Sequence, residues 1–243
     1  MNQPVMPRRI NHATFDQLFA EGAEAVLSGE HGIEVPPADG GRRWGVSVLL
    51  RPEAEAALAL EALARDAGAV AGDGHWLTGA AHSSHLTVRA LEWPRPGEVP
   101  ANDPSVARYA AALRTAMADI GSLAFDVVGL TLTRLSVMAC AMPVGEAPDR
   151  LSAALAEALG EDAWLERGIA FHRSIWYLNL VHFAAPIEPR RARALVDWVA
   201  GRRALGPIRV RVAGVEVAAW RFTGTGMTPR RLAAYPAAAS VPG

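Results

Sequence analysis

The sequence predicts an α+β protein of two lobes, built from a unit of strand, helix and two strands that occurs twice. In the first unit a strand begins at His85, a helix follows, and a later strand carries Gly129, 44 residues after His85. In the second unit a strand holds His172, a helix follows, and Gly214 lies 42 residues after His172. Nearly equal spacings indicate an internal duplication, which predicts two lobes related by a pseudo-two-fold axis.

The individual elements follow from hydrophobic patterning and from the positions of proline and glycine. Runs rich in β-branched and aromatic residues predict strands at 44–50, 85–93, 125–132, 135–142 and 171–183, and one or two more within 208–222. Helices are predicted at about 53–66, 104–120, 148–160 and 189–203. Asp103 is expected to cap its helix and Gly68 to end the first one. The Ala-rich segment after Pro229 is predicted to be irregular or helical.

Three regions are expected along the chain. Residues 1–42 form an N-terminal helical and loop extension, in which Phe15, Leu18, Phe19 and Val26 recur at helical spacing. Residues 43–228 form the bilobed domain, and 229–243 form a C-terminal tail.

Composition narrows the classes of protein to consider. With 24 basic and 25 acidic residues among 243, the net charge is −1, which argues against a basic surface that binds long duplex nucleic acid. The single Cys140 excludes a disulfide framework, and it is expected to be a buried, inert thiol. The sequence contains no uninterrupted stretch of about 18 apolar residues, so no membrane span is predicted. We therefore expect a cytoplasmic protein with no membrane partner.

Two short polar motifs carry the chemistry. On a strand, side chains at i and i+2 point to the same face, so His85 lies beside Thr87 and His172 beside Ser174. If the duplication holds, the two pairs face each other between the lobes. Such a site has two groups that exchange protons near neutral pH and two hydroxyls for an anionic oxygen. This pattern suits cleavage of a phosphodiester by a paired acid and base, with no metal ion and no cofactor.

Both motifs resemble the His-x-Thr/Ser-x pair of the 2H phosphoesterase superfamily, which includes the bacterial RNA 2′,3′-cyclic phosphodiesterases once called 2′-5′ RNA ligases. The segment from His85 to Val88 matches the pattern at all four positions, whereas Arg173 replaces the hydrophobic residue expected after His172. The resemblance spans about residues 44–222. It implies a duplicated fold with antiparallel sheets lining a central cleft and helices outside, and it implies that His85 and His172 are catalytic.

Neighbouring residues give further candidates. Thr87 and Ser174 are expected to bind the phosphate. Arg89 shares their face if the strand stays regular, so it is either a phosphate contact or part of a rim salt bridge. Trp176 either stacks on a base or packs in the core. His182 lies ten residues after His172, roughly 33 Å along a strand, which is too far to join the catalytic pair.

The predicted function is therefore that of a metal-independent phosphodiesterase acting on a cyclic phosphate or a small nucleotide. A small nucleotide, an RNA end or a phosphorylated metabolite is the expected substrate. Two alternatives stay open: a nucleotide- or phosphate-binding module without turnover, and acid–base chemistry on another small metabolite.

Overall fold

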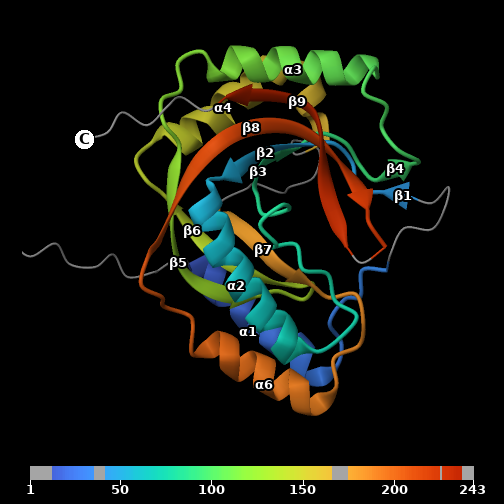
Figure 1. The fold of residues 1–243 in the computed structure, drawn as a ribbon, viewed down its shortest axis with the longest axis vertical. Coiled ribbons are helices and arrows are strands. Elements are labelled where there is room, and N and C mark those ends of the chain that lie inside the picture. The colour runs from blue at the N-terminus through green and yellow to red at the C-terminus, as the bar shows by residue number, and fades with distance from the viewer. Residues whose placement is uncertain (1–12, 36–41, 166–174, 225, 237–243) are drawn as a thin grey trace, which may run out of the picture.

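The computed structural model describes residues 13–35, 42–165, 175–224 and 226–236, so His172 and Ser174 lie outside the described residues. The described segments form a seven-stranded antiparallel sheet, a two-stranded ribbon and surrounding helices (Figure 1). In chain order the elements are α1 (Ala13–Ser28), β1 (Arg42–Arg43), β2 (Ser47–Pro52), α2 (Ala54–Ala71), β3 (Leu86–Ala90), β4 (Arg95–Pro96), α3 (Pro104–Met117), β5 (Ala124–Leu132), β6 (Ser136–Pro143), α4 (Ala147–Leu159), the 3-10 turn η1 (Gly160–Ala163), β7 (Trp176–His182), α6 (Pro189–Ala200), β8 (Ile208–Phe222) and β9 (Met227–Pro236).

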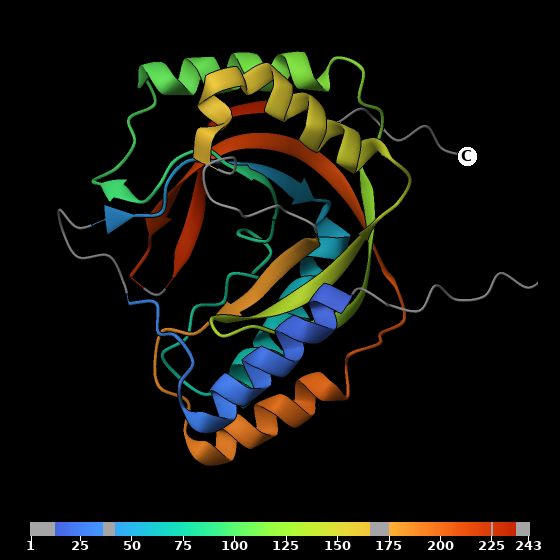
Figure 2. The same cartoon turned by 180° about the vertical axis from the view of Figure 1, so that it is seen from behind.

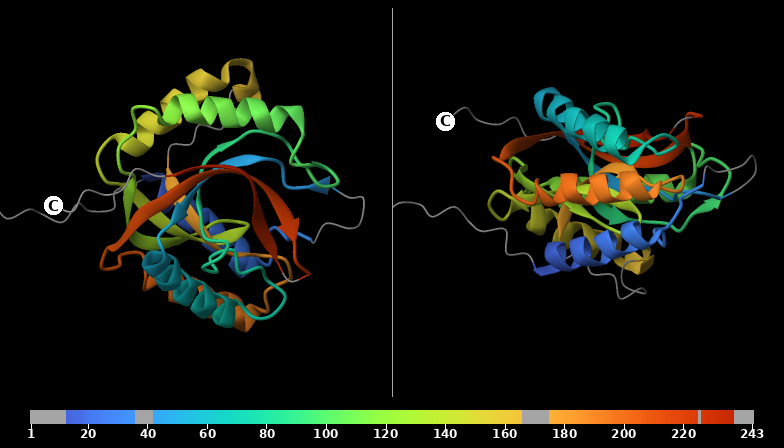
Figure 3. Two further views of the ribbon diagram at one scale, coloured as in Figure 1. Left: turned by 45° about the horizontal axis from the view of Figure 1, so that its top comes forward. Right: turned by 90° about the horizontal axis from the view of Figure 1, so that it is seen from below.

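One long strand, β8, joins the two halves of the sheet. Its residues 208–211 pair with β5, and its residues 212–218 pair with β2. The strand order is β3-β2-β8-β5-β6-β7, and β9 pairs with the second part of β8. We refer to β2, β3, β9 and the second part of β8 as the β2 half, and to β5, β6, β7 and the first part of β8 as the β5 half. β8 arches across the molecule between them (Figure 3).

The helices cover the outside of both halves. α3 and α4 pack on each other and over the β2 half, whereas α1 and α6 pack against β5 (Figures 1 and 2). α2 packs against β7 and β8, on the face of the β5 half opposite to α1. The main hydrophobic core runs through both halves and includes Val48, Leu86, Leu130 and Leu178. Among the described residues, none of the helices combines the length and the apolar character that crossing a bilayer requires.

Most predicted elements are present, and the differences have local causes. Asp103 caps α3 as predicted, because its side chain accepts a hydrogen bond from the Ser105 amide at 3.0 Å. The predicted stop at Gly68 is wrong, since α2 continues to Ala71 and ends at Gly72, whose φ of 107° favours glycine. Gly68 instead allows close packing, because a Cβ there would meet Leu77 Cδ2 at 2.7 Å.

The expected irregular or helical segment after Pro229 is also wrong, because residues up to Pro236 continue strand β9. Its pairing with β8 explains the outcome: Tyr235 lies opposite Val215 and packs on the main core. Alternation of apolar and polar residues is weak in this Ala-rich stretch, so the strand depends on its partner rather than on its own pattern.

The N-terminal helix is packed into the protein. The predicted amphipathic helix is confirmed as α1, and the Phe15 side chain is fully buried. The Thr131 hydroxyl of β5 donates a 2.9 Å hydrogen bond to the Phe15 carbonyl. Gly22 lies against the end of β5, where an added Cβ would meet the Leu132 carbonyl carbon at 2.7 Å. Close backbone contact therefore fixes α1 on β5.

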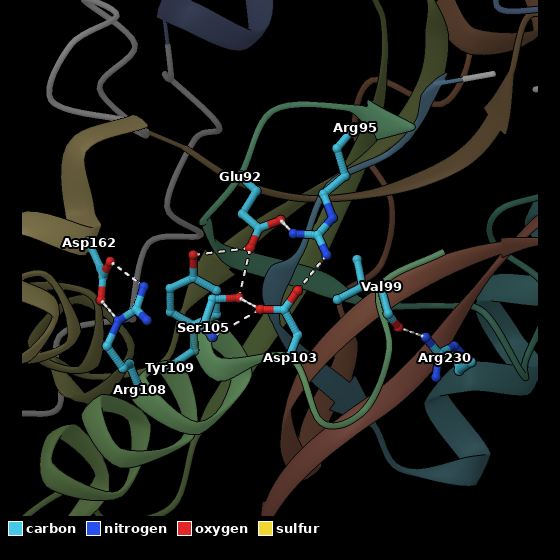
Figure 4. A network of polar contacts seen from close by, with 9 residues as sticks. All are labelled: Glu92, Arg95, Val99, Asp103, Ser105, Arg108, Tyr109, Asp162 and Arg230. Atoms are coloured by element: carbon cyan, nitrogen blue, oxygen red, sulfur yellow. Dashed lines mark hydrogen bonds and ion pairs between the residues drawn. The ribbon is translucent and has the colours of Figure 1, made fainter. Parts of the chain in front are cut away.

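A polar network holds the start of α3 to the segment that follows β3 (Figure 4). Arg95 binds the carboxylates of Glu92 at 3.2 Å and Asp103 at 2.6 Å. Ser105 and Tyr109 donate to Glu92 at 3.2 and 3.1 Å. Burial and the Glu92 charge raise the pKa of Tyr109 to about 12, so its hydroxyl stays a donor at neutral pH. These contacts anchor the chain just beyond β3.

Gly22→Ala should destabilise the protein despite the higher helix propensity of alanine. The new methyl group meets the backbone of Leu132 and Thr133 at 2.7–2.8 Å, so α1 has to move away from β5. We expect the free energy of unfolding to fall by about 1–3 kcal/mol, measured by urea denaturation. Gly68→Ala is the matched control, because its methyl group meets only the end of the Leu77 side chain. Equal effects of the two substitutions would contradict this account.

Candidate active site

His85 lies directly before β3 and is held by its own loop. The chain turns at residues 80–84, where the amides of Ser83 and Ser84 donate to the Ala80 carbonyl at 2.8 and 2.7 Å. The Ser83 carbonyl lies 2.7 Å from His85 Nδ1. A carbonyl only accepts, so this bond assigns the proton of the neutral ring to Nδ1 and the lone pair to Nε2. The imidazole is almost fully buried and is oriented by the backbone.

Thr87 lies on a defined face of the β2 half. It pairs with Leu49 of β2, which in turn pairs with Glu216 of β8. Paired residues on adjacent strands point to the same side of a sheet. Leu49 belongs to a small hydrophobic cluster with Ala218 and Trp220 that is separate from the main core. We call this side the His85 face, because the ring of His85 lies 4.9 Å from that of Trp220.

Arg89 does not keep the face that a regular strand would give it. The β2–β3 register shifts between Val48 and Leu49, so that Arg89 pairs with Val48 while Thr87 pairs with Leu49. Val48 is fully buried in the main core, on the opposite side of the sheet from Leu49. The extra residue of this β-bulge, Val88, therefore reverses Arg89 relative to Thr87. The regular strand that the alternation argument requires is therefore absent at Arg89, and its contact with a phosphate stays a prediction.

An aromatic cluster adjoins His85. The Trp44 ring lies 5.0 Å from Trp220, 5.9 Å from Trp76 and 5.2 Å from His182, and Phe222 lies 6.2 Å from Trp76. Trp76 and Trp220 are buried, whereas Trp44 and Phe222 are partly exposed. The rings come from the segments before β2 and β3 and from the ends of β7 and β8. The Trp220 ring contacts His85, and the other rings extend this apolar surface away from it.

Glu34, in the segment that follows α1, connects two members of this cluster. Its carboxylate accepts a hydrogen bond from Trp44 Nε1, and its other oxygen lies 3.2 Å from His182 Nδ1. No pattern in the sequence places Glu34, Trp44 or Trp220 near His85. From the sequence, His182 is expected to lie too far along the strand from His172 to join the catalytic pair. It is connected to His85 by a chain of ring contacts, because His182 contacts Trp44, Trp44 contacts Trp220, and Trp220 contacts His85.

Two further histidines flank Phe183 at the end of β7. The rings of His31 and His75 lie 5.5 and 5.7 Å from the Phe183 ring. The Ala184 amide donates to His75 Nδ1 at 3.3 Å, so this nitrogen must be unprotonated. Burial lowers the pKa of His75 below its ordinary value, and His31 acts in the same direction. His75 is therefore a neutral, structural histidine.

The remaining predicted residues make structural contacts. Trp176 Nε1 donates to Asp149 at 2.8 Å, and its ring lies 5.1 Å from Phe125 at the edge of the main core. Cys140 is buried, and burial raises the pKa of its thiol to about 12, as expected of an inert cysteine. In the described part of the chain, no three His, Cys, Asp or Glu side chains gather as they would around a metal ion.

Comparison with known proteins gives a result for the fold. No protein-family pattern and no curated protein sequence matches this chain. Among solved structures, TT0787 of Thermus thermophilus superposes with a TM-score of 0.52 at 18% identity, over 80% of this chain and 97% of that one. E. coli LigT complexed with phosphate superposes with a TM-score of 0.51 at 14% identity, over 82% and 99% of the chains. The complex of LigT with ATP gives a TM-score of 0.51 at 14% identity, over 81% and 99%.

The chain has a LigT-like fold. The predicted α+β architecture is thereby confirmed, with antiparallel strands in both halves of the sheet. In this fold the motif of His85 and Thr87 lies at the start of β3 and on the His85 face. The motif of His172 and Ser174 lies outside the described residues, so its pairing with His85 stays a prediction.

Protonation of His75 should destabilise the protein in acid. In the unfolded chain His75 takes up a proton near pH 6.5, whereas in the folded chain its pKa is lower. The stability that neutral His75 contributes is therefore present above pH 6.5 and is lost as the pH falls below it. Urea unfolding at about pH 7.5 and 5.5 should show a smaller acid loss for His75→Gln than for wild type. The exposed His82→Gln serves as control, and an equal acid loss in all three proteins would contradict this prediction.

Proposed function

We propose that this protein is a metal-independent phosphodiesterase that hydrolyses a cyclic phosphate or a small nucleotide phosphodiester. His85 and His172 are the acid–base pair, and Thr87 and Ser174 hold the phosphoryl oxygens. The observation that carries the proposal is the hydrogen bond from His85 Nδ1 to the Ser83 carbonyl. It leaves Nε2 as the nitrogen that exchanges a proton with a substrate, with the Thr87 hydroxyl on the same strand.

The similarity of this chain's fold to that of LigT supports a function in binding or cleaving phosphate esters. LigT has been crystallised with phosphate and with ATP, and it shares its fold with this chain. A nucleotide offers both a phosphoryl group for the histidine and hydroxyl pairs and a planar base. The aromatic cluster beside His85 offers partly exposed rings of Trp44 and Phe222 on which a base could stack.

In the proposed reaction, one histidine accepts a proton from a water molecule as its oxygen forms a bond to phosphorus. The other histidine donates a proton to the ribose oxygen as the bond from that oxygen to phosphorus breaks. A 2′,3′-cyclic phosphate then becomes a phosphomonoester, and the two histidines have exchanged protonation states. The hydroxyls of Thr87 and Ser174 donate to the oxygens on which negative charge develops.

The first test is hydrolysis of a panel of 2′,3′-cyclic nucleotides, oligonucleotides with cyclic ends and linear 2′-5′ dinucleotides, in buffer containing EDTA. Wild type should turn over at least one member. His85→Ala and His172→Ala should each lower kcat by about 100-fold or more, because each removes one partner of the proton transfer. His82→Ala is the matched control, since this exposed histidine lies three residues from His85 in the same loop.

Each pattern of results separates the proposal from its alternatives. Product formation that is lost in both variants and kept in His82→Ala supports the phosphodiesterase. Nucleotide binding without product, measured by calorimetry on folded wild type, would favour a binding module. Turnover that survives both histidine substitutions would overturn the paired mechanism.

Thr87 provides an independent test of phosphate positioning. Thr87→Val keeps the shape of the side chain but removes its hydroxyl, so kcat should fall by about 10- to 100-fold with little change in stability. Thr87→Ser keeps the hydroxyl and should retain most of the activity. Equal rates for the two variants would show that this hydroxyl does not contact the reacting phosphate.

A further inference from the structure

Arg51 shares the loop that holds His85. Its guanidinium Nη2 donates a 2.6 Å hydrogen bond to the His82 carbonyl. The next carbonyl along the chain, that of Ser83, accepts from His85 Nδ1 at 2.7 Å. Arg51 and His85 thus bind adjacent carbonyl groups of one turn, the first from β2 and the second from the start of β3.

The register of β2 and β3 explains this arrangement. Leu49 pairs with Thr87 and Leu50 with Leu86, so continuing the ladder by one residue brings Arg51 opposite His85. Directly opposite residues of an antiparallel pair have Cβ atoms about 5 Å apart. Because Arg51 alternates with Leu49, its side chain lies on the His85 face.

A buried carboxylate orients Arg51 from the other side. Glu216 of β8 is almost fully buried, and its Oε2 lies 4.0 Å from Arg51 Nε. Its Oε1 accepts from Nε of Arg231 at 2.9 Å. A line of charged groups therefore runs from β9 through β8 and β2 to the turn that carries His85.

This arrangement is a costly way to obtain stability alone. The Arg51 side chain is mostly buried, and its Nη1 is shielded from solvent and has no hydrogen-bond partner among the described residues. Burial lowers the pKa of Arg51 despite the neighbouring Glu216. A buried charge with an unfilled donor is often no more stabilising than an apolar side chain of similar size. Its direct connection to the His85 loop points to a role in the site.

We propose that Arg51 is a positioning residue for His85: it holds the 80–84 turn so that the Ser83 carbonyl orients the imidazole, and it places a positive charge beside the ring. This inference rests on the proposed function for the role of His85 in turnover. Its effect on the His85 ring itself can be measured without any substrate.

The charged groups around His85, among the described residues, determine the direction in which the titration midpoint of His85 should shift when Arg51 is replaced. Arg51, Glu216 and Arg231 come from β2, β8 and β9, and Glu34 and His182 lie beyond the rings of Trp220 and Trp44. Arg51→Gln removes one of the two arginine charges and leaves Glu216 paired with Arg231. The imidazolium form of His85 then meets less repulsion, so its titration midpoint should rise.

The experiment is an NMR titration of the histidine rings in labelled protein, with His85→Gln used to assign the signals. In Arg51→Gln the His85 midpoint should rise by about half a pH unit or more, and the Nδ1-protonated tautomer should lose its dominance. Arg51→Lys, which keeps the charge and a donor, should restore the wild-type midpoint. Arg209→Gln is the matched control, because Arg209 pairs with Asp126 on the surface of the other half of the sheet.

If Arg51→Gln does not fold, Glu216→Gln gives the same information with opposite sign, because it removes the negative charge and should lower the His85 midpoint. A midpoint and tautomer unchanged from wild type in the folded variant would overturn the proposal. In the panel assay, Arg51→Gln should lower kcat about tenfold with a shifted pH profile. If wild type shows no turnover while the ring titration shifts as expected, the proposed function fails and the positioning role stands.

Discussion

The architecture depends on β8, because this single strand carries the register of both halves of the sheet. It pairs with β5 over residues 208–211 and with β2 over residues 212–218. A slip of one residue would move every β8 side chain to the other face. Glu216, Ala218 and Trp220 would then leave the His85 face and enter the main core. β3 pairs only with β2 among the described strands, so the position of His85 is also set through β2 and β8. The site is thus fixed by a strand more than a hundred residues away in the sequence.

Local sequence signals were sufficient for most elements and for placing Thr87 on the same face as His85. The Asp103 cap, the helices α3 and α4 and the strands β5 and β6 depend on neighbouring residues, and the structure agrees with the pattern. The rule that side chains at i and i+2 of a strand share a face holds from His85 to Thr87. It fails at Arg89, because the bulge at Val88 is a property of pairing with β2 and leaves no mark in the β3 sequence. Gly68 fails as a helix stop for a similar reason: its small size is used for packing against Leu77, a contact that only the fold creates.

The surroundings of His85 could not be predicted, because they assemble from distant segments. Trp44, Trp76, His182 and Trp220 are separated by up to 176 positions, and each alone is typical of an ordinary buried aromatic residue. Arg51 and Glu216 likewise have the pattern of strand residues exposed on a polar face, whereas Glu216 is buried and Arg51 mostly so. A chain of nearly neutral net charge gives no sign of such local pairing. The candidate site therefore combines a motif that the sequence predicts to be catalytic with an environment that only the topology brings together.

The two parts of this environment act on different properties of the site. The turn at residues 80–84, bound by Arg51, controls the orientation and charge balance of the His85 ring. The aromatic cluster controls what can lie beside it, and its orientation depends on Glu34, which binds Trp44 and contacts His182. Glu34 belongs to the N-terminal extension, whose helix is anchored on β5 through Phe15 and Gly22. The extension thus does more than complete the core: through Glu34 it reaches the rings that adjoin His85, so its packing is coupled to the shape of the candidate active site.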